Sequence, residues 1–147
     1  MAKKNIVPLK ELNLTDRFLF DEVMEDPTIH QEVLSLILGR EISLLQESKT
    51  EKESRISPLI RSIRMDLFAI DSEEQVYNTE MQKKRKDDLP KRSRYYQGMM
   101  DLQLIDSGQP YKKLNQSYVI FICLEDVFGK NRHIYTFENI CREDPGI

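Results

Sequence analysis

The chain has 147 residues, of which 39% are hydrophobic and 32% are charged, and its formal net charge at pH 7 is −3. This length suits one domain, residues 1–147, and the charge content is typical of a water-soluble protein. The longest apolar run, residues 118–124, is too short to cross a bilayer, and the N-terminus has no apolar signal segment, so we expect a cytoplasmic protein without a membrane partner.

The small numbers of cysteines, histidines and glycines exclude several kinds of site. Two cysteines, Cys123 and Cys141, cannot build a disulfide framework or a four-cysteine zinc site. The two histidines, His30 and His133, have no partner at metal-ligand spacing. The five glycines form no phosphate-binding loop of the P-loop or Rossmann kind. We therefore expect neither a zinc enzyme, nor a Cys-His nucleophile, nor an ATPase or a dinucleotide enzyme.

The first third of the chain predicts two helices and a weak strand. Thr15 or Asp16 would cap the first helix, because apolar residues at helical spacing follow them. Asp26 and the proline after it predict a second helix start, and Gly39 predicts its end. Residues 42–50 are a weak candidate for a first strand, since their second half is polar.

The middle of the chain predicts a β-hairpin followed by a long helix. Residues 62–70 alternate in polarity with a period of two, as a strand requires, and residues 75–82 form a second strand after a short turn. Asp88 and Pro90 then predict the start of a helix that ends at Gly108.

The last third predicts one long strand and a further short one. The apolar run at 118–124 is nearly uninterrupted, which is typical of a strand in the centre of a sheet. Residues 133–137 are a candidate for one more short strand. The order of helix, strand, hairpin, helix and strand predicts an α/β domain with a mixed sheet.

Two acidic residues stand where acids are uncommon. Asp66 lies in the middle of the first hairpin strand, and Glu80 lies near the middle of the second, with Gln82 on the same face. Asp66 can lie opposite Glu80 only if Ile70 lies opposite Val76. That register requires a loop of five residues, or a shorter turn with a bulge.

Two opposed carboxylates create an electrostatic problem that a cation would solve. At a separation of ~4 Å they repel each other by about 4 kcal/mol at an effective dielectric of ~20. A shared proton or a divalent cation relieves the repulsion, and oxygen ligands completed by waters suit Mg²⁺ or Mn²⁺. The alternative is that Asp66 pairs with Arg64 on a solvent-facing side of the sheet, with Glu80 an ordinary exposed strand residue.

A basic block follows Gln82 directly. Residues 83–94 carry seven basic side chains and two acidic ones, so this block is +5 and the rest of the chain is −8. Such a block binds a polyanion or forms a solvated loop and helix face. Tyr95 and Tyr96 next to it are packing residues or platforms on which bases stack. The basic residues of the block are Lys83, Lys84, Arg85, Lys86, Lys91, Arg92 and Arg94.

Five ordered segments together resemble the PD-(D/E)XK nuclease superfamily, in its transposase-like, recombination-promoting branch. They are Leu14–Phe20, Arg64–Asp66, Tyr77–Gln82, Arg94–Gln97 and Tyr118–Ile122. The resemblance implies a restriction-endonuclease-like αβββαβ core, with a mixed central sheet flanked by helices. This order agrees with the elements above and implies a first strand near residues 42–50.

The resemblance also implies a metal-dependent DNA endonuclease related to those of mobile elements. Asp66 and Glu80 would hold one or two Mg²⁺ or Mn²⁺ ions, with the main-chain carbonyl of Met81, and Gln82 would position the attacking water. Gln82 stands where the superfamily more often has lysine, and an amide can only hydrogen-bond.

The positive charge that Gln82 lacks would come from Lys83 or Lys84. The resemblance further implies that the basic block follows a DNA backbone and that Arg64 steadies Asp66 or reaches a phosphate.

Relatives of this branch usually continue beyond the last strand, so the single domain would lack their C-terminal part, and a homodimer would suit cutting of both strands. The alternative function is a catalytically inactive nucleic-acid-binding or interaction module that retains the nuclease fold. A third is a purely structural domain without affinity for nucleic acid.

Overall fold

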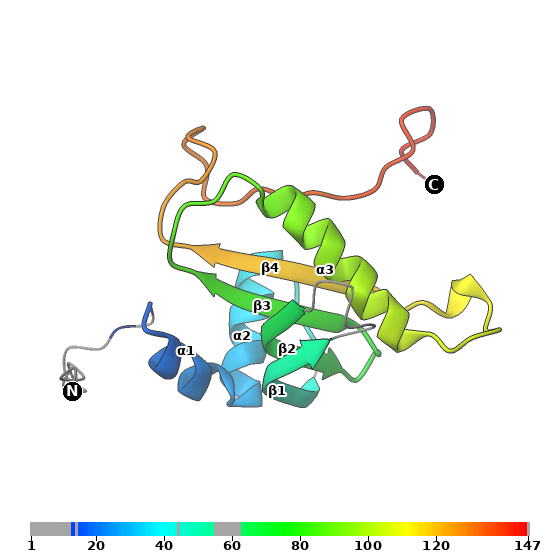
Figure 1. Ribbon diagram of the computed structural model, residues 1–147, viewed down its shortest axis with the longest axis horizontal. Helices are drawn as coiled ribbons and strands as arrows, with labels where there is room; N and C mark the ends of the chain where they lie inside the picture. Colours follow the sequence, from blue (N-terminus) through cyan, green and yellow to red (C-terminus); the bar gives the residue numbers. More distant parts are fainter. Residues whose placement is uncertain (1–12, 14, 44, 55–62, 147) are drawn as a thin grey trace, which may run out of the picture.

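The computed structural model describes residues 13, 15–43, 45–54 and 63–146, which form a four-stranded mixed sheet with helices packed on it (Figure 1). The expected αβββαβ order is confirmed. Among the described residues, no helix is long and apolar enough to cross a membrane. In chain order the elements are α1 (Arg17–Met24), α2 (Pro27–Leu38), β1 (Leu45–Ser54), β2 (Ile63–Asp71), β3 (Val76–Gln82), α3 (Leu89–Leu104), the 3₁₀ turn η2 (Tyr111–Lys113) and β4 (Ser117–Cys123).

Helix α2 begins and ends where its capping residues predict. The side chain of Asp26 accepts the backbone N–H groups of Thr28 and Ile29 at 2.8 and 3.2 Å. Gly39 ends the helix with φ 64°, a left-handed conformation that glycine adopts without steric cost. Helix α3 starts after Asp88 as expected, but it ends at Leu104, earlier than the glycine that its sequence suggested.

The sheet has the strand order β1-β2-β3-β4, in which β1, β2 and β3 are antiparallel and β4 runs parallel to β3. The weak first strand is confirmed as β1, shifted toward the C-terminus of the segment 42–50. β1 pairs with β2 along almost its whole length. Main-chain hydrogen bonding therefore accounts for this strand, which its polar sequence signals poorly.

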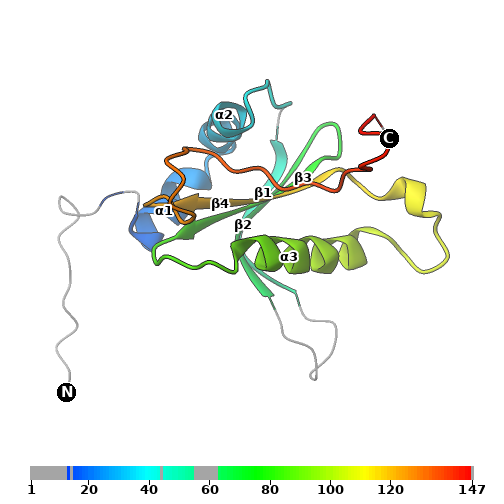
Figure 2. The same cartoon turned by 90° about the horizontal axis from the view of Figure 1, so that it is seen from above.

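The expectation that the strand near 118–124 is central was wrong, because β4 lies at the edge of the described sheet. Its apolar sequence reflects cover on both faces instead. Tyr118 and Ile120 pack against the core on the α2 side, and Val119 packs against the core on the α3 side. Figure 2 shows α2 and α3 on opposite sides of the sheet. A strand that packs against a hydrophobic layer on each face has a continuous apolar sequence even at an edge, where its residues are only partly buried.

The expectation of a strand at residues 133–137 was also wrong, because no strand forms there. Asp126 accepts three backbone N–H groups of the loop that follows it and, at 2.7 Å, the hydroxyl of Tyr135. The bond from Tyr135, together with the three backbone bonds, lowers the pKa of Asp126 to about 2. The Phe128 ring packs against Tyr135 and Phe137. These local contacts take the place of strand pairing.

Each face of the sheet buries its own hydrophobic layer. On the α2 side, Leu34 packs with Tyr77 of β3, and both are fully buried. On the α3 side, Met99 and Met100 pack with Phe68 of β2. The two layers hold β2 and β3 between helices, so polar side chains on these strands are buried wherever a helix lies above them.

The buried His30 of α2 makes stability depend on pH. Its Nε2 lies 3.3 Å from Thr79 Oγ1, and burial lowers its pKa from 6.5 to about 4. Between these values the unfolded chain binds more protons than the folded one, so stability falls as the pH drops below the unfolded pKa. We expect this residue to reduce the free energy of unfolding by about 2 kcal/mol between pH 7.5 and pH 5. Urea unfolding at the two pH values measures this difference.

His30→Gln should remove that part of the pH dependence, whereas His133→Gln, at an exposed position, should keep it. An identical decrease in stability on acidification in the His30 variant would contradict the assignment.

Candidate active site

The hairpin β2–β3 has the register that the expected site requires. Ile70 pairs with Val76, as the site requires, and the pairing continues without a shift toward the start of β2. Continued by one more residue, this register places Asp66 across from Glu80. Directly opposed residues of an antiparallel pair share a face, with Cβ atoms ~4.5–5.5 Å apart.

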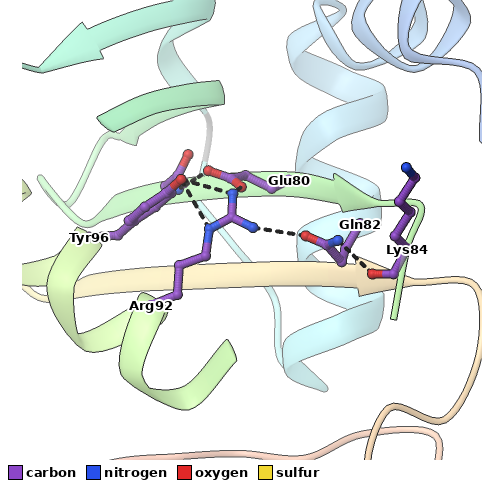
Figure 3. Close-up of polar contacts among 6 residues, drawn as sticks. Glu80, Gln82, Lys84, Arg92 and Tyr96 are labelled. Carbon is purple, nitrogen blue, oxygen red and sulfur yellow. Dashed lines mark hydrogen bonds and ion pairs between the residues drawn. The ribbon is translucent and has the colours of Figure 1, made fainter. Parts of the chain in front are cut away.

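Glu80 is a buried carboxylate with hydrogen-bond donors on both oxygens. Its side chain is 3% exposed. Oε1 accepts from Nδ2 of Asn78 at 3.3 Å. Oε2 accepts from Nη2 of Arg92 at 2.7 Å (Figure 3). This charge-assisted bond from the partly exposed Arg92 holds the buried carboxylate in one orientation.

The side-chain amide of Gln82 is also fixed on both sides. Its Oε1 accepts from Nη1 of Arg92 at 2.8 Å, and its Nε2 donates to the main-chain oxygen of Lys84 at 2.6 Å (Figure 3). The amide nitrogen carries two hydrogens, and among the described residues only the Lys84 oxygen accepts from it, so one N–H of Gln82 has no partner there.

Arg92 in the first turns of α3 links the two strand residues. Its Nε and Nη2 donate to the hydroxyl of Tyr96 at 3.1 and 2.8 Å. Its guanidinium carbon lies 5.0 Å from the ring centres of both Tyr96 and Phe121. Residues four positions apart on a helix share a face, which explains why Arg92 and Tyr96 reach the site together.

The charge of Asp66 acts on the same two residues of α3 as the charge of Glu80 does. Burial acts to lower the pKa of Arg92, but the hydrogen bond with Tyr96 and the negative charges of Glu80 and Asp66 outweigh it and raise the pKa. Burial and the charges of Glu80 and Asp66 raise the pKa of Tyr96, against the effect of Arg92. Two residues of α3 thus feel the half-buried Asp66 carboxylate together with Glu80.

The remaining residues of the expected site lie around this centre. Met81 points its side chain to the opposite face, into the core with Phe20 and Leu67, so only its main chain can serve the site. The side chain of Arg64 lies outside the part of the chain that the structure describes. The other basic residues are exposed, in the loop between β3 and α3 and on α3, at Lys83, Lys84, Arg85, Lys86, Lys91 and Arg94.

Sequence reasoning missed two features of the site. Asn78, fully buried beside Glu80, was not singled out, although the spacing of two residues in a strand puts it on the same face. The pairing of Arg92 with Glu80 and Gln82 was not foreseen either. The helical spacing of Arg92 and Tyr96 was the available signal, but it does not reveal which strand residues they meet.

The donor atoms at this centre suit a hard divalent cation. Carboxylate oxygens come from Asp66 and Glu80, and the buried Oδ1 of Asn78 has no hydrogen-bond partner among the described residues. No group of three His, Cys, Asp or Glu side chains in the described ranges is arranged to hold a metal ion. Two carboxylates are nevertheless enough for Mg²⁺, which keeps several waters and is often bound by one or two carboxylates plus phosphate oxygens.

A comparison with models of known protein families shows which family the chain resembles. The model of the PD-(D/E)XK nuclease family transposases matches residues 17–141, from the start of α1 to beyond β4. The chain belongs to this family. The resemblance inferred from the five sequence segments is therefore confirmed, and membership in this nuclease family supports a nuclease-like function. The chain has no significant match among curated proteins or solved structures.

Proposed function

We propose that this protein is a metal-dependent DNA endonuclease that hydrolyses phosphodiester bonds, related to the nucleases of mobile elements. The observation that supports the proposal is the β2–β3 register, in which Ile70 to Leu67 pair with Val76 to Thr79 inside the segment that the family matches. One further step of this register would set Asp66 opposite Glu80 on one face. Gln82 lies two residues after Glu80 in β3, so its side chain lies on the same face.

The chain's own residues would divide the work as follows. Asp66, Glu80 and the main-chain carbonyl of Met81 would hold one or two Mg²⁺ or Mn²⁺ ions. When bound, such an ion would supply a lowered pKa for a water molecule and stabilisation of charge on a phosphoryl oxygen. Gln82, fixed by Arg92 and by the Lys84 carbonyl, uses its remaining N–H to orient the attacking water.

DNA is the partner that suits the surface beside this centre. The exposed side chains Lys83–Lys86 directly follow β3, and Lys91 and Arg94 continue the positive surface onto α3. The family resemblance would add Arg64, a residue of β2, as a further contact to a phosphate. Contacts with phosphates release counterions, so binding should weaken steeply with salt. Cytoplasmic location and a homodimer that cuts both strands, in DNA recombination, complete the proposal.

Nicking of supercoiled plasmid tests the proposal. We expect the purified protein to convert supercoiled into open-circular plasmid in Mg²⁺ or Mn²⁺. We expect an excess of EDTA to stop the reaction, because it removes the ion that Asp66 and Glu80 would hold for water activation. Agarose gels measure the conversion. A mobility-shift titration at several salt concentrations measures binding in parallel.

Salt-sensitive binding without nicking would favour the inactive nucleic-acid-binding module. Neither binding nor nicking would favour a structural domain.

A further inference from the structure

The guanidinium of Arg92 occupies the centre of the candidate site. One end of it bonds to Gln82 at 2.8 Å and the other to Glu80 at 2.7 Å, so it joins two strand residues that lie on the same face. The arrangement supplies, from α3, the positive charge that Gln82 lacks. Neither exposed lysine of the β3–α3 loop needs to reach inward to provide it.

Both carboxylate oxygens of Glu80 accept a hydrogen bond in this arrangement, so a further ligand must weaken or replace one of these bonds. Oε1 is engaged by the neutral amide of Asn78 and Oε2 by the charged guanidinium of Arg92. The bond from Arg92 is the shorter and the charge-assisted one. The same guanidinium also feels the negative charge of Asp66. Arg92 is thus a positive charge that pairs with Glu80 and also interacts electrostatically with Asp66.

Other contacts would hold Arg92 in place if its bond to Glu80 were lost. The Tyr96 hydroxyl accepts from Nε, and Gln82 accepts from Nη1. The rings of Tyr96 and Phe121 each lie 5.0 Å from the guanidinium carbon. A small movement can therefore free Oε2 of Glu80 while the positive charge stays beside Gln82.

We propose that Arg92 is a positioning residue that competes with the divalent ion for Glu80: it neutralises Glu80 before the ion binds and releases Oε2 when it binds, while it keeps Gln82 oriented. This inference rests on the proposed metal-dependent function. It assigns to Arg92 a place inside the site, in addition to the expected role of the basic block on the DNA backbone.

Binding of Mn²⁺ to the purified chain tests the competition without any nuclease assay. Isothermal titration calorimetry should give a dissociation constant for Arg92→Met that is about tenfold lower than that of the wild type, because a positive charge is removed next to the ion. Arg40→Met is the matched control. Arg40 donates to Gln75 Oε1 at 2.7 Å and to the Tyr118 hydroxyl at 3.0 Å, and it lies over the Tyr118 ring, but at the start of the parallel strands. The Arg40→Met variant should bind Mn²⁺ with the affinity of the wild type.

The outcomes separate the two proposals. Tighter binding of Mn²⁺ by Arg92→Met, but not by Arg40→Met, supports the competition. The same holds if Arg92→Met binds measurably and the wild type binds too weakly to measure. Equal or weaker binding by Arg92→Met, with measurable binding by the wild type, overturns the competition and leaves the proposed function intact. Absence of binding in both overturns the competition and the metal-dependent function together.

A measurement on the wild type keeps the test independent of the folding of the variant. The arginine Nε–H resonances can be followed by ¹⁵N NMR while Mg²⁺ is added. The resonance of Arg92, which donates to Tyr96, should shift as Oε2 of Glu80 is released, and that of Arg40 should not. An unchanged Arg92 signal at saturating Mg²⁺ would overturn the competition.

Discussion

Asp66→Asn and Glu80→Gln are each expected to slow plasmid nicking at least about a hundredfold. Each removes one of the two negative charges that would hold the proposed ion, and a metal contributes several kcal/mol to such a reaction. Both substitutions keep the shape of the side chain. In Glu80→Gln the amide oxygen can still accept the hydrogen bond from Arg92, so the fold should survive. Initial rates of plasmid conversion at saturating Mg²⁺ measure the effect.

Stability and a distant control distinguish a chemical effect from a structural one. Glu80→Gln should cost about 1–2 kcal/mol of the free energy of unfolding, because a charged hydrogen bond becomes a neutral one. Glu73→Gln removes a negative charge in the turn, at the far end of the hairpin from Glu80. The nicking rate of this variant should match that of the wild type. Nicking that persists at the wild-type rate in either Asp66→Asn or Glu80→Gln would refute the catalytic assignment.

The hairpin could be predicted from the sequence because its signals are local. Alternation with a period of two identifies each strand, and the number of residues between Ile70 and Val76 then permits the register that aligns Asp66 with Glu80. The caps of α2 at Asp26 and Gly39 are local in the same sense. Each of these features depends on residues only a few positions apart.

The position of β4 and the partner of Arg92 could not be predicted, because both depend on packing between distant segments. An apolar run shows that both faces of a strand are buried, but it does not name the neighbouring strands. In the basic block, Arg92 looks like its neighbours. Only the docking of α3 on the sheet turns it toward Glu80, twelve positions earlier in the chain, and leaves Lys91 and Arg94 exposed.

The turn that sets the site's register depends on one buried acid, Asp71. Its side chain is fully buried, and its Oδ1 accepts the backbone N–H groups of Glu73 and Gln75, both at 2.9 Å. Its Oδ2 accepts the hydroxyl of Tyr77 at 2.8 Å. Glu74 completes the turn in a left-handed conformation, with φ 61°. The Asp71 carboxylate therefore accepts backbone N–H groups that have no strand partner in the turn between β2 and β3.

Asp71→Ala is expected to lower the free energy of unfolding by about 3 kcal/mol, because three hydrogen bonds to a buried carboxylate are lost and two backbone N–H groups are left to find other partners. Tyr77→Phe removes one of these bonds and should cost about 1 kcal/mol. Glu73→Ala, which loses only an exposed bond to Gln75, should cost less than about 0.5 kcal/mol. Urea unfolding of the three variants measures these differences.

Hydrogen exchange then connects the turn to the site. In Asp71→Ala the amides of Glu73 and Gln75 should exchange faster than in the wild type, and the affinity for Mn²⁺ should fall, because a shift of one residue in register would turn Glu80 away from Asp66. If the variant were as stable as the wild type, with unchanged exchange at both amides, Asp71 would not be what fixes the turn. The pairing of the β2 and β3 backbones alone would then have to hold the two acids in line.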